Sequence, residues 1–239
     1  MGNLHQVWTL LWGTPLIGIA VTVAAYEAGR AAQQSSGGLA IVNPVLIAML
    51  LLIALLELTR TPYETYFESA RLLYFPLGPA TVALAIPLYR NYQRLRHSIA
   101  SVMVAVIAGA MAAALSAIGI AWLAGAPGSL LRSIAPKSVT APIAIGISQE
   151  IGGTPGLTAV LVVITGVLGA VISGFVLDRL RVRSAAARGL AMGVAAHGIG
   201  TARALAESET AGAFSSLAMA LCALLTALFL PPLARLLLG

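Results

Sequence analysis

The sequence has 239 residues, of which 59% are hydrophobic and 9% are charged, and its mean hydropathy is +0.94. A soluble domain carries about 25% charged residues, so these charges are too few to cover a surface that faces water. The composition excludes a cytosolic enzyme, a nucleic-acid-binding module and a disordered tail, and it indicates that lipid surrounds most of the chain. Cys222 is the only cysteine, which excludes an internal disulfide and CxxC redox chemistry.

Seven apolar stretches approach the roughly 20 residues that a helix needs to cross a hydrocarbon core of about 30 Å. They are residues 7–28, 43–57, 72–89, 98–124, 157–177, 189–206 and 213–233. An eighth region, 130–152, is apolar in patches but is interrupted by prolines, a lysine, a glutamate and a pair of glycines. The sequence therefore predicts an all-α integral membrane protein with about seven transmembrane helices, forming a single polytopic membrane domain over residues 1–239.

The positions of the arginines predict the orientation of the chain, because cytoplasmic loops of membrane proteins are rich in Arg and Lys. Two expected loops carry seven arginines: Arg90, Arg94 and Arg96 in one, and Arg179, Arg181, Arg183 and Arg188 in the other. If both loops are cytoplasmic, region 130–152 must enter and leave on the same side, as a re-entrant pair of half-helices. The same count places the N-terminus and residues 207–209 outside, and Arg30, Arg235 and the C-terminus in the cytoplasm.

Three segments break the expected helices, and unwound backbone survives at membrane depth only inside protein or beside a cavity. Glycine and proline mark these breaks: Gly78 and Pro79 in the first, Pro136 and Pro142 in the second, and Gly198 and Gly200 in the third. Under this topology the broken stretches 72–89 and 189–206 run in opposite directions. Discontinuous helices in this arrangement are typical of the inverted repeats of secondary transporters.

Two basic residues, Lys137 and Arg203, are left over once the loops and chain ends are assigned, and each follows a helix break closely. A charged side chain at bilayer depth costs at least a few kcal/mol unless it has a partner or lines a cavity. Half-helix N-termini favour a carboxylate, and hydroxyl donors from Ser138, Thr140 and Thr201 lie in the same segments. These five residues are the candidate anion site. In the alternative interpretation, Lys137 extends to the outer surface and Arg203 pairs with Glu207, four residues later.

His197 and Glu150 are the candidates for proton coupling. A neutral histidine titrates near physiological pH, and an intramembrane carboxyl does so if burial raises its pKa. In the alternative interpretation, Glu150 lies solvated at the outer rim and His197 hydrogen-bonds a carbonyl that its own helix break has freed.

Signatures of enzymes are missing from the sequence. There is no HExxH motif, and His5, His97 and His197 lie far apart without clustered carboxylates, so no metal site is expected. The pair Gly198-x-Gly200 lacks the strand context of a dinucleotide fold, and Gly153-Thr-Pro-Gly156 lacks the P-loop lysine. We therefore expect a protein that is not an enzyme and that binds no cofactor.

Four groups of motifs make the sequence similar to the LrgB/CidB family over nearly its whole length. They are Asn43-Pro-Val-Leu46, segment 77–89, segment 136–144 with Glu150-Ile-Gly-Gly153, and Ala196-His-Gly-Ile-Gly-Thr-Ala-Arg203 followed by segment 212–219. The resemblance implies holin-like or antiholin-like control of murein hydrolases and autolysis. A plant relative is the plastidal glycolate/glycerate translocator, and bacterial members are linked to 2-oxo and 2-hydroxy carboxylates such as pyruvate. Because the sequence contains only the LrgB half, the resemblance implies a bacterial inner-membrane protein with a separate LrgA-like partner.

Two classes of function fit these features. In the first, the protein is a secondary transporter of small 2-hydroxy or 2-oxo monocarboxylates, and the broken helices hold the anion. In the second, it is a holin-like or antiholin-like pore or regulator, and the breaks serve packing alone. We expect a homo-oligomer, a dimer, that forms through the stretches without breaks or charges. Residues 1–60 are then the candidate scaffold, and residues 72–230 hold the candidate substrate site.

Overall fold

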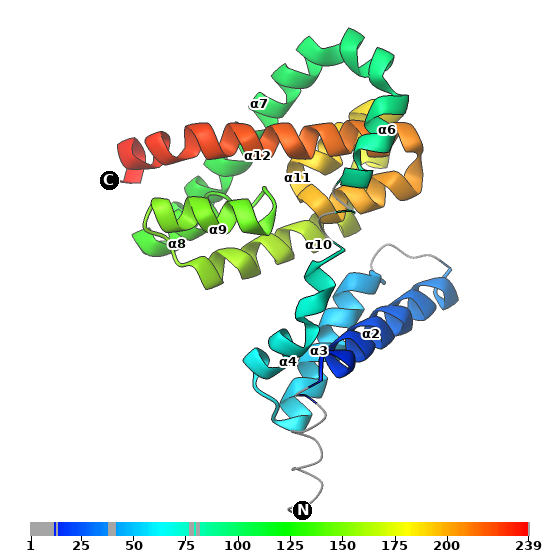
Figure 1. Ribbon diagram of the computed structural model, residues 1–239. Coiled ribbons are helices and arrows are strands. Elements are labelled where there is room, and N and C mark those ends of the chain that lie inside the picture. Colours follow the sequence, from blue (N-terminus) through cyan, green and yellow to red (C-terminus); the bar gives the residue numbers. More distant parts are fainter. Residues whose placement is uncertain (1–11, 13, 38–41, 77–78, 80–81, 239) are drawn as a thin grey trace, which may run out of the picture. The chain divides into compact units, whose positions relative to one another are not determined.

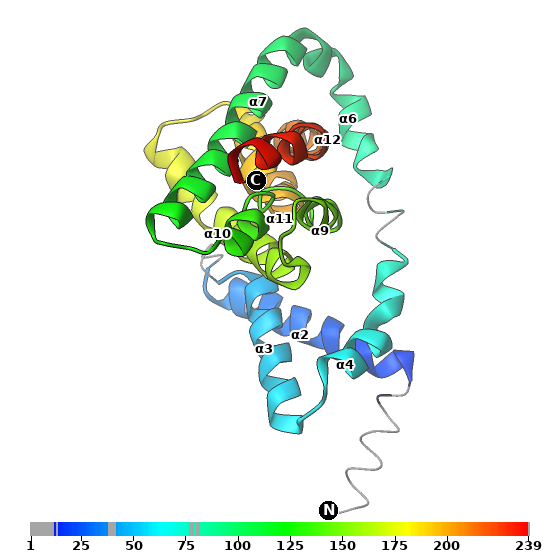
Figure 2. The same cartoon turned by 90° about the vertical axis from the view of Figure 1, so that its left-hand side faces the viewer.

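A computed structural model describes residues 12, 14–37, 42–76, 79 and 82–238, and every regular element in this part of the chain is a helix (Figures 1 and 2). The chain divides into two compact units, residues 1–83 and 84–239. The expected break at Gly78 lies outside the described residues, whereas the adjacent Pro79 is described and exposed.

The first unit contains α2 (Pro15–Ser35), α3 (Pro44–Thr59), α4 (Tyr63–Ala70) and the short 3₁₀ helix η1 (Arg71–Tyr74). Proline begins α2 and α3, where its missing N–H costs nothing. The side chain of Asn43 caps α3 by accepting hydrogen bonds from the amides of Val45 and Leu46. The amide of Gly18 in α2 donates to Ser69 Oγ at 2.9 Å, which joins α2 to α4.

Three long apolar helices dominate the second unit: α7 (Tyr92–Leu123), α10 (Pro155–Arg179) and α12 (Glu209–Leu238). At 1.5 Å per residue they are about 48, 37 and 45 Å long, so each is long and apolar enough to cross a membrane. They coincide with the expected crossings 98–124, 157–177 and 213–233, of which residue 124 alone falls outside, as the C-cap of α7. Exposed apolar side chains along α7, including Val104 and Ile120 at 69% exposure each, are suited to lipid.

The expected crossing at residues 72–89 is not one helix. Helix η1 ends at Tyr74, and α6 (Ala85–Arg90) has Pro87 inside it; residues 79, 82 and 83 between them are also helical. The interruption of this stretch agrees with the sequence, which expects a broken helix here.

Residues 128–150 form hairpin one, which consists of α8 (Gly128–Ile134), a loop and α9 (Ala141–Glu150). The base of the hairpin is closed by polar groups: Thr154 N donates to Ser133 Oγ at 2.8 Å, and Thr158 Oγ1 lies 2.7 Å from Ser148 Oγ. The three hydroxyl-bearing residues Ser133, Ser148 and Thr158 are fully buried. The segment returns to the level at which it started, as the sequence predicts for residues 130–152.

Residues 185–207 form hairpin two, which is the single assigned helix α11 (Ala185–Glu207) broken at His197. The backbone of His197 has φ 41° and ψ −129°, and Arg188 Nε lies 2.9 Å from Glu207 Oε2. In an unbroken helix these two residues would be about 28 Å apart. The chain therefore turns back at His197, and residues 189–206 do not cross from one end of the unit to the other. The prediction of a crossing here is wrong.

Glycines allow hairpin two to pack closely against its neighbours. A Cβ atom at Gly166 or Gly169 of α10 would lie 2.6 Å from His197 Cε1 or Ala196 Cβ, respectively. A Cβ at Gly193 would overlap the backbone of Ser215 in α12, and one at Gly200 would overlap the backbone of Met192 in the other arm. The Gly166-x-x-Gly169 face therefore serves packing within one protomer.

Polar contacts define two opposite ends of the second unit. At one end, Arg90 pairs with Glu209 at 3.6 Å, Arg94 donates to Thr210 at 3.2 Å, and Arg188 reaches Asp178 at 2.6 Å. These contacts gather the start of α7, the end of α10, the base of hairpin two and the start of α12, and we call this the Arg-rich end. At the other end of α12, Arg235 pairs with Glu150 at 3.2 Å.

This arrangement changes the expected sidedness of two segments. The prediction that residues 207–209 lie opposite the arginine-rich loops is wrong, because hairpin two brings them back to the Arg-rich end. The prediction that Arg235 lies on the same side as those loops is also wrong, because α12 carries it to Glu150. Both predictions fail for the same physical reason. The chain turns back at His197, so one membrane crossing fewer separates the arginine-rich loops from the C-terminus.

Cysteine labelling tests this arrangement. In a background that lacks Cys222, we expect Arg183→Cys and Ser208→Cys to react with an impermeant maleimide from one side of the membrane. Gly128→Cys and Thr154→Cys should react from the opposite side. Accessibility of positions 183 and 208 from opposite sides would contradict the hairpin at His197 and restore a crossing over residues 189–206.

Candidate functional site

The turning points of the two hairpins face each other in the interior of the second unit (Figure 1). Hairpin one follows α7 and enters from the end opposite the Arg-rich end, whereas hairpin two follows α10 and enters from the Arg-rich end. The two helix–hairpin units, residues 92–150 and 155–207, thus run in opposite directions. The sequence instead predicted opposite directions for stretches 72–89 and 189–206.

His197 forms the turn of hairpin two and is 5% exposed. Its Nε2 lies 3.1 Å from the carbonyl oxygen of Val162 in α10. A positive φ at a residue that is not glycine is strained and persists only where the surroundings enforce it. Close packing of the imidazole against Gly166 supplies that constraint. The hydrogen bond to a carbonyl agrees with the structural role that the sequence left open for His197, although the carbonyl belongs to α10.

Thr201 lies one turn after His197 and links hairpin two to α12. Its hydroxyl donates to the carbonyl of His197 at 2.8 Å and lies 3.0 Å from Ser215 Oγ. The Sδ atom of Met219 is 3.8 Å from the same hydroxyl. Thr201 is 1% exposed and Ser215 is fully buried. A buried polar group needs a partner, and these contacts supply one for each hydroxyl.

Lys137 lies in the turn of hairpin one and is half-buried. Its Nζ atom lies 3.5 Å from Ser138 Oγ, and no carboxylate pairs with it among the residues that the structure describes. Its ammonium is close enough to His197 for an electrostatic interaction, so the turns of the two hairpins approach each other. A half-buried cation without a carboxylate is suited to bind an anion.

Helix N-termini reinforce the positive potential between the turns. Thr140 is the N-cap of α9, but its side chain makes no capping hydrogen bond. The second arm of hairpin two begins at Gly198, directly after the turn. A helix N-terminus carries a partial positive charge, so each hairpin adds one such terminus to the same region. The proline pair at 136 and 142 and the glycines at 198 and 200 thus lie where the sequence expected the breaks.

The structure does not bring Arg203 or Glu150 to the turns. Arg203 Nε lies 3.8 Å from Glu207 Oε1, and its Nη2 packs near Gly174. Gly174 is eight residues, or about 12 Å along α10, beyond the glycine that contacts His197. Glu150 pairs with Arg235 at the far end, and both side chains are more than half exposed. Their surroundings therefore agree with the alternative interpretation, in which Arg203 pairs with Glu207 and Glu150 lies solvated at the rim.

Sequence reasoning missed two features of this region. The first is the contact of Ser215 and Met219 with Thr201. Both residues belong to the motif at 212–219, which could have indicated a role for them. The pair between Arg188 and Glu207 also went unnoticed, because 19 residues separate them along the chain. Only a folded-back helix makes that pair possible.

The second unit thus has the fold of a helical membrane protein in which two oppositely directed hairpins meet around a half-buried cation and hydroxyl groups. No solved structure matches this chain. The model of the LrgB-like family matches residues 22–236, so the chain belongs to the LrgB-like family.

Three relatives illustrate the family. The uncharacterized protein YwbG of Bacillus subtilis (strain 168) is 41% identical over 77% of this chain and 82% of its own length. YxaC from the same organism is 37% identical over 90% of this chain and 94% of its own length. The antiholin-like protein LrgB of Bacillus cereus (strain B4264) is 30% identical over 91% and 95% of the two chains, respectively.

Proposed function

We propose that this protein is a secondary transporter of small 2-hydroxy or 2-oxo monocarboxylates, the class of glycolate, glycerate and pyruvate. The observation that carries the proposal is Lys137, a half-buried ammonium at the turn of one hairpin that faces the turn of another. The substrate carboxylate pairs with Lys137, and Ser138 and Thr140 donate hydrogen bonds to it. Transport of this kind needs no enzymatic step, cofactor or metal.

The hydroxyl or keto group next to the carboxylate suits the other side of the site. His197 and Thr201 lie in hairpin two, so a substrate whose 2-oxygen is carried by the carbon next to its carboxylate bridges the two turns. A substrate that bridges two hairpins couples their movement, because neither turn can open toward its own side while both hold the anion. Alternating access at a midplane site between inverted repeats follows this principle.

The proposed orientation puts the Arg-rich end in the cytoplasm, as the positive-inside rule requires. Hairpin two then enters from the cytoplasm, hairpin one enters from outside, and α12 carries the C-terminus outward. We propose a homodimer in the bacterial inner membrane, with the first unit as its scaffold and an LrgA-like protein as a further partner.

Uptake into proteoliposomes that contain this chain alone tests the proposal. We expect saturable accumulation of labelled glycolate or pyruvate, and competition by unlabelled lactate. Acetate, which lacks the 2-oxygen, should compete at least tenfold less well, because a hydrogen-bonding site left unpaired costs on the order of 1–3 kcal/mol. Leak of unrelated solutes such as sucrose, without saturation, would contradict a transporter.

An antiholin-like regulator is the second candidate function, and the name of the Bacillus cereus relative favours it. In that case the hairpins would serve packing, and the protein would modulate a pore formed by a partner. The same vesicles distinguish the two candidates: a regulator alone gives neither saturable uptake nor leak, and it changes the leak of vesicles that also contain the LrgA-like partner.

A further inference from the structure

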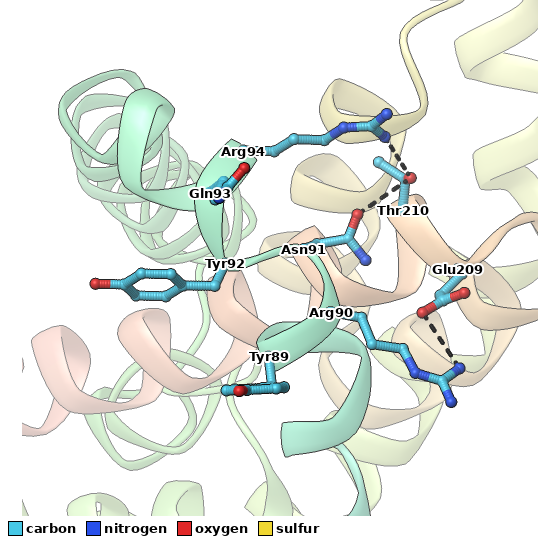
Figure 3. A pocket seen from close by; sticks show the side chains of 8 residues that line it. All are labelled: Tyr89, Arg90, Asn91, Tyr92, Gln93, Arg94, Glu209 and Thr210. Atoms are coloured by element: carbon cyan, nitrogen blue, oxygen red, sulfur yellow. Dashed lines mark hydrogen bonds and ion pairs between the residues drawn. The ribbon is translucent and has the colours of Figure 1, made fainter.

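We propose that a cavity at the Arg-rich end binds the phosphate group of an anionic phospholipid. The cavity has a volume of about 760 Å³ and lies between the junction of α6 with α7 and the start of α12 (Figure 3). Its lining combines two arginines with polar and aromatic side chains: Tyr89, Arg90, Asn91, Tyr92, Gln93, Arg94, Glu209 and Thr210.

The polar wall of the cavity is organised before any ligand binds. Arg94 donates to Thr210 Oγ1 at 3.2 Å, and Thr210 in turn donates to Asn91 Oδ1 at 3.4 Å. The amide of the Asn91 side chain donates to the carbonyl of Pro87 at 3.0 Å. Asn91 is 9% exposed, so this chain of hydrogen bonds has a buried anchor. It fixes the position of Arg94 relative to α12.

The two arginines have N–H donors that can still bind a ligand. Arg94 has no carboxylate partner among the described residues, and the hydroxyl of Thr210 uses one of its five N–H donors. Arg90 pairs with Glu209 at 3.6 Å, but both side chains are more than half exposed, and such surface pairs contribute little. A phosphate matches the forked donors of arginine in a bidentate manner, so it can bind both guanidinium groups.

The position of the cavity, at the ends of membrane-length helices, favours a lipid over a soluble molecule as the source of that phosphate. Two helices long enough to span a membrane, α7 and α12, begin at its wall. Tyr89 and Tyr92 flank it with exposed rings, and tyrosine is enriched at the headgroup level of bilayers. Apolar side chains such as Ile86 and Ile99, each about half exposed, lie on the two helices that meet at the cavity, α6 and α7. Basic pockets between membrane helices bind anionic headgroups in this way.

Bound lipid would add to the contacts that already join the two sides of the cavity. The start of α12 follows the base of hairpin two directly, and the junction of α6 with α7 belongs to the other side of the cavity. This inference does not depend on the proposed transport function, because it concerns the Arg-rich end rather than the turns of the hairpins.

Thermal unfolding of the purified chain in detergent tests the proposal. Added phosphatidylglycerol should raise the unfolding midpoint of the wild-type protein, and phosphatidylcholine should not. In the double variant Arg90→Gln/Arg94→Gln the apparent affinity for phosphatidylglycerol should fall on the order of twentyfold, because each arginine near an anionic headgroup contributes about a factor of five. The control Arg179→Gln/Arg183→Gln removes two arginines from the same end, outside the cavity, and should retain the affinity.

Three outcomes would overturn the proposal. The first is the absence of any shift with phosphatidylglycerol, and the second is an equal loss of affinity in the two double variants, which would indicate diffuse attraction to the Arg-rich end. The third concerns the source of the phosphate: sn-glycerol 3-phosphate at millimolar concentration should give no shift. If it stabilises the wild-type protein as phosphatidylglycerol does, the ligand is a soluble phosphate and not a lipid.

Discussion

Replacement of Lys137 by alanine is expected to abolish most carboxylate uptake while the protein still folds. Removal of a charged hydrogen bond costs about 1.5–3 kcal/mol, or roughly ten- to a hundredfold in substrate affinity. Stability should not suffer, because Lys137 has no carboxylate partner among the described residues that its loss would leave uncompensated. The measurements are the KM for labelled glycolate in proteoliposomes and the midpoint of thermal unfolding.

Two control variants sharpen this test. Lys137→Arg keeps the positive charge and should retain part of the uptake. Arg203→Ala removes an equal charge from hairpin two, but Arg203 lies beside Glu207, so we expect the KM to stay within about twofold of wild type. Arg60 in the first unit should be equally neutral. If Lys137→Ala leaves the KM unchanged, or if Arg203→Ala raises it as much as Lys137→Ala does, the anion site lies elsewhere.

Replacement of Arg188 by alanine is expected to destabilise the protein by about 3 kcal/mol, because it removes one partner of a largely buried ion pair. The side chains of Arg188 and Glu207 are 15% and 19% exposed, and their closest atoms are 2.9 Å apart. The substitution leaves Glu207 and Asp178 without their shared cation. Arg183→Ala, at an exposed position, should change stability by less than about 0.5 kcal/mol.

A double-mutant cycle tests whether these residues really meet. Residues that touch give interaction energies of about 0.5–3 kcal/mol, whereas distant residues give additive effects. We therefore expect Arg188→Ala combined with Glu207→Ala to cost less than the sum of the two single changes in denaturant unfolding. Additive effects would place the residues at opposite ends of a straight helix and would contradict hairpin two.

Much of the secondary structure could be predicted because the bilayer imposes a simple length rule. The stretches 98–124, 157–177 and 213–233 are uninterrupted, and each became a membrane-length helix. Parity of the arginines also predicted that residues 130–152 return to their starting level. Where the apolar signal is interrupted, as at 72–89, the described helices are short as well: a 3₁₀ helix and a short α-helix lie at the two ends of the stretch.

The candidate site was predictable in part. Breaks at Pro136, Pro142, Gly198 and Gly200 mark the turns, and Lys137 and His197 occupy them. Arg203 was assigned to the site from its distance to the break in sequence. Arg203 lies six residues after His197, which corresponds to about 9 Å along a helix. This places it near Glu207 and away from the turn.

The sequence by itself determined that lipid surrounds this protein, where its three long helices lie in the chain, and at which residues helices must break. Composition and apolar length are local properties, and lipid acts on them directly. Only the tertiary structure decided that α11 folds back at His197, because a kinked crossing and a hairpin have the same hydropathy. Close backbone approach at Gly166, Gly193 and Gly200 and the pairing of Arg188 with Glu207 favour the hairpin. Those contacts join residues far apart in the chain, so no local pattern reveals them.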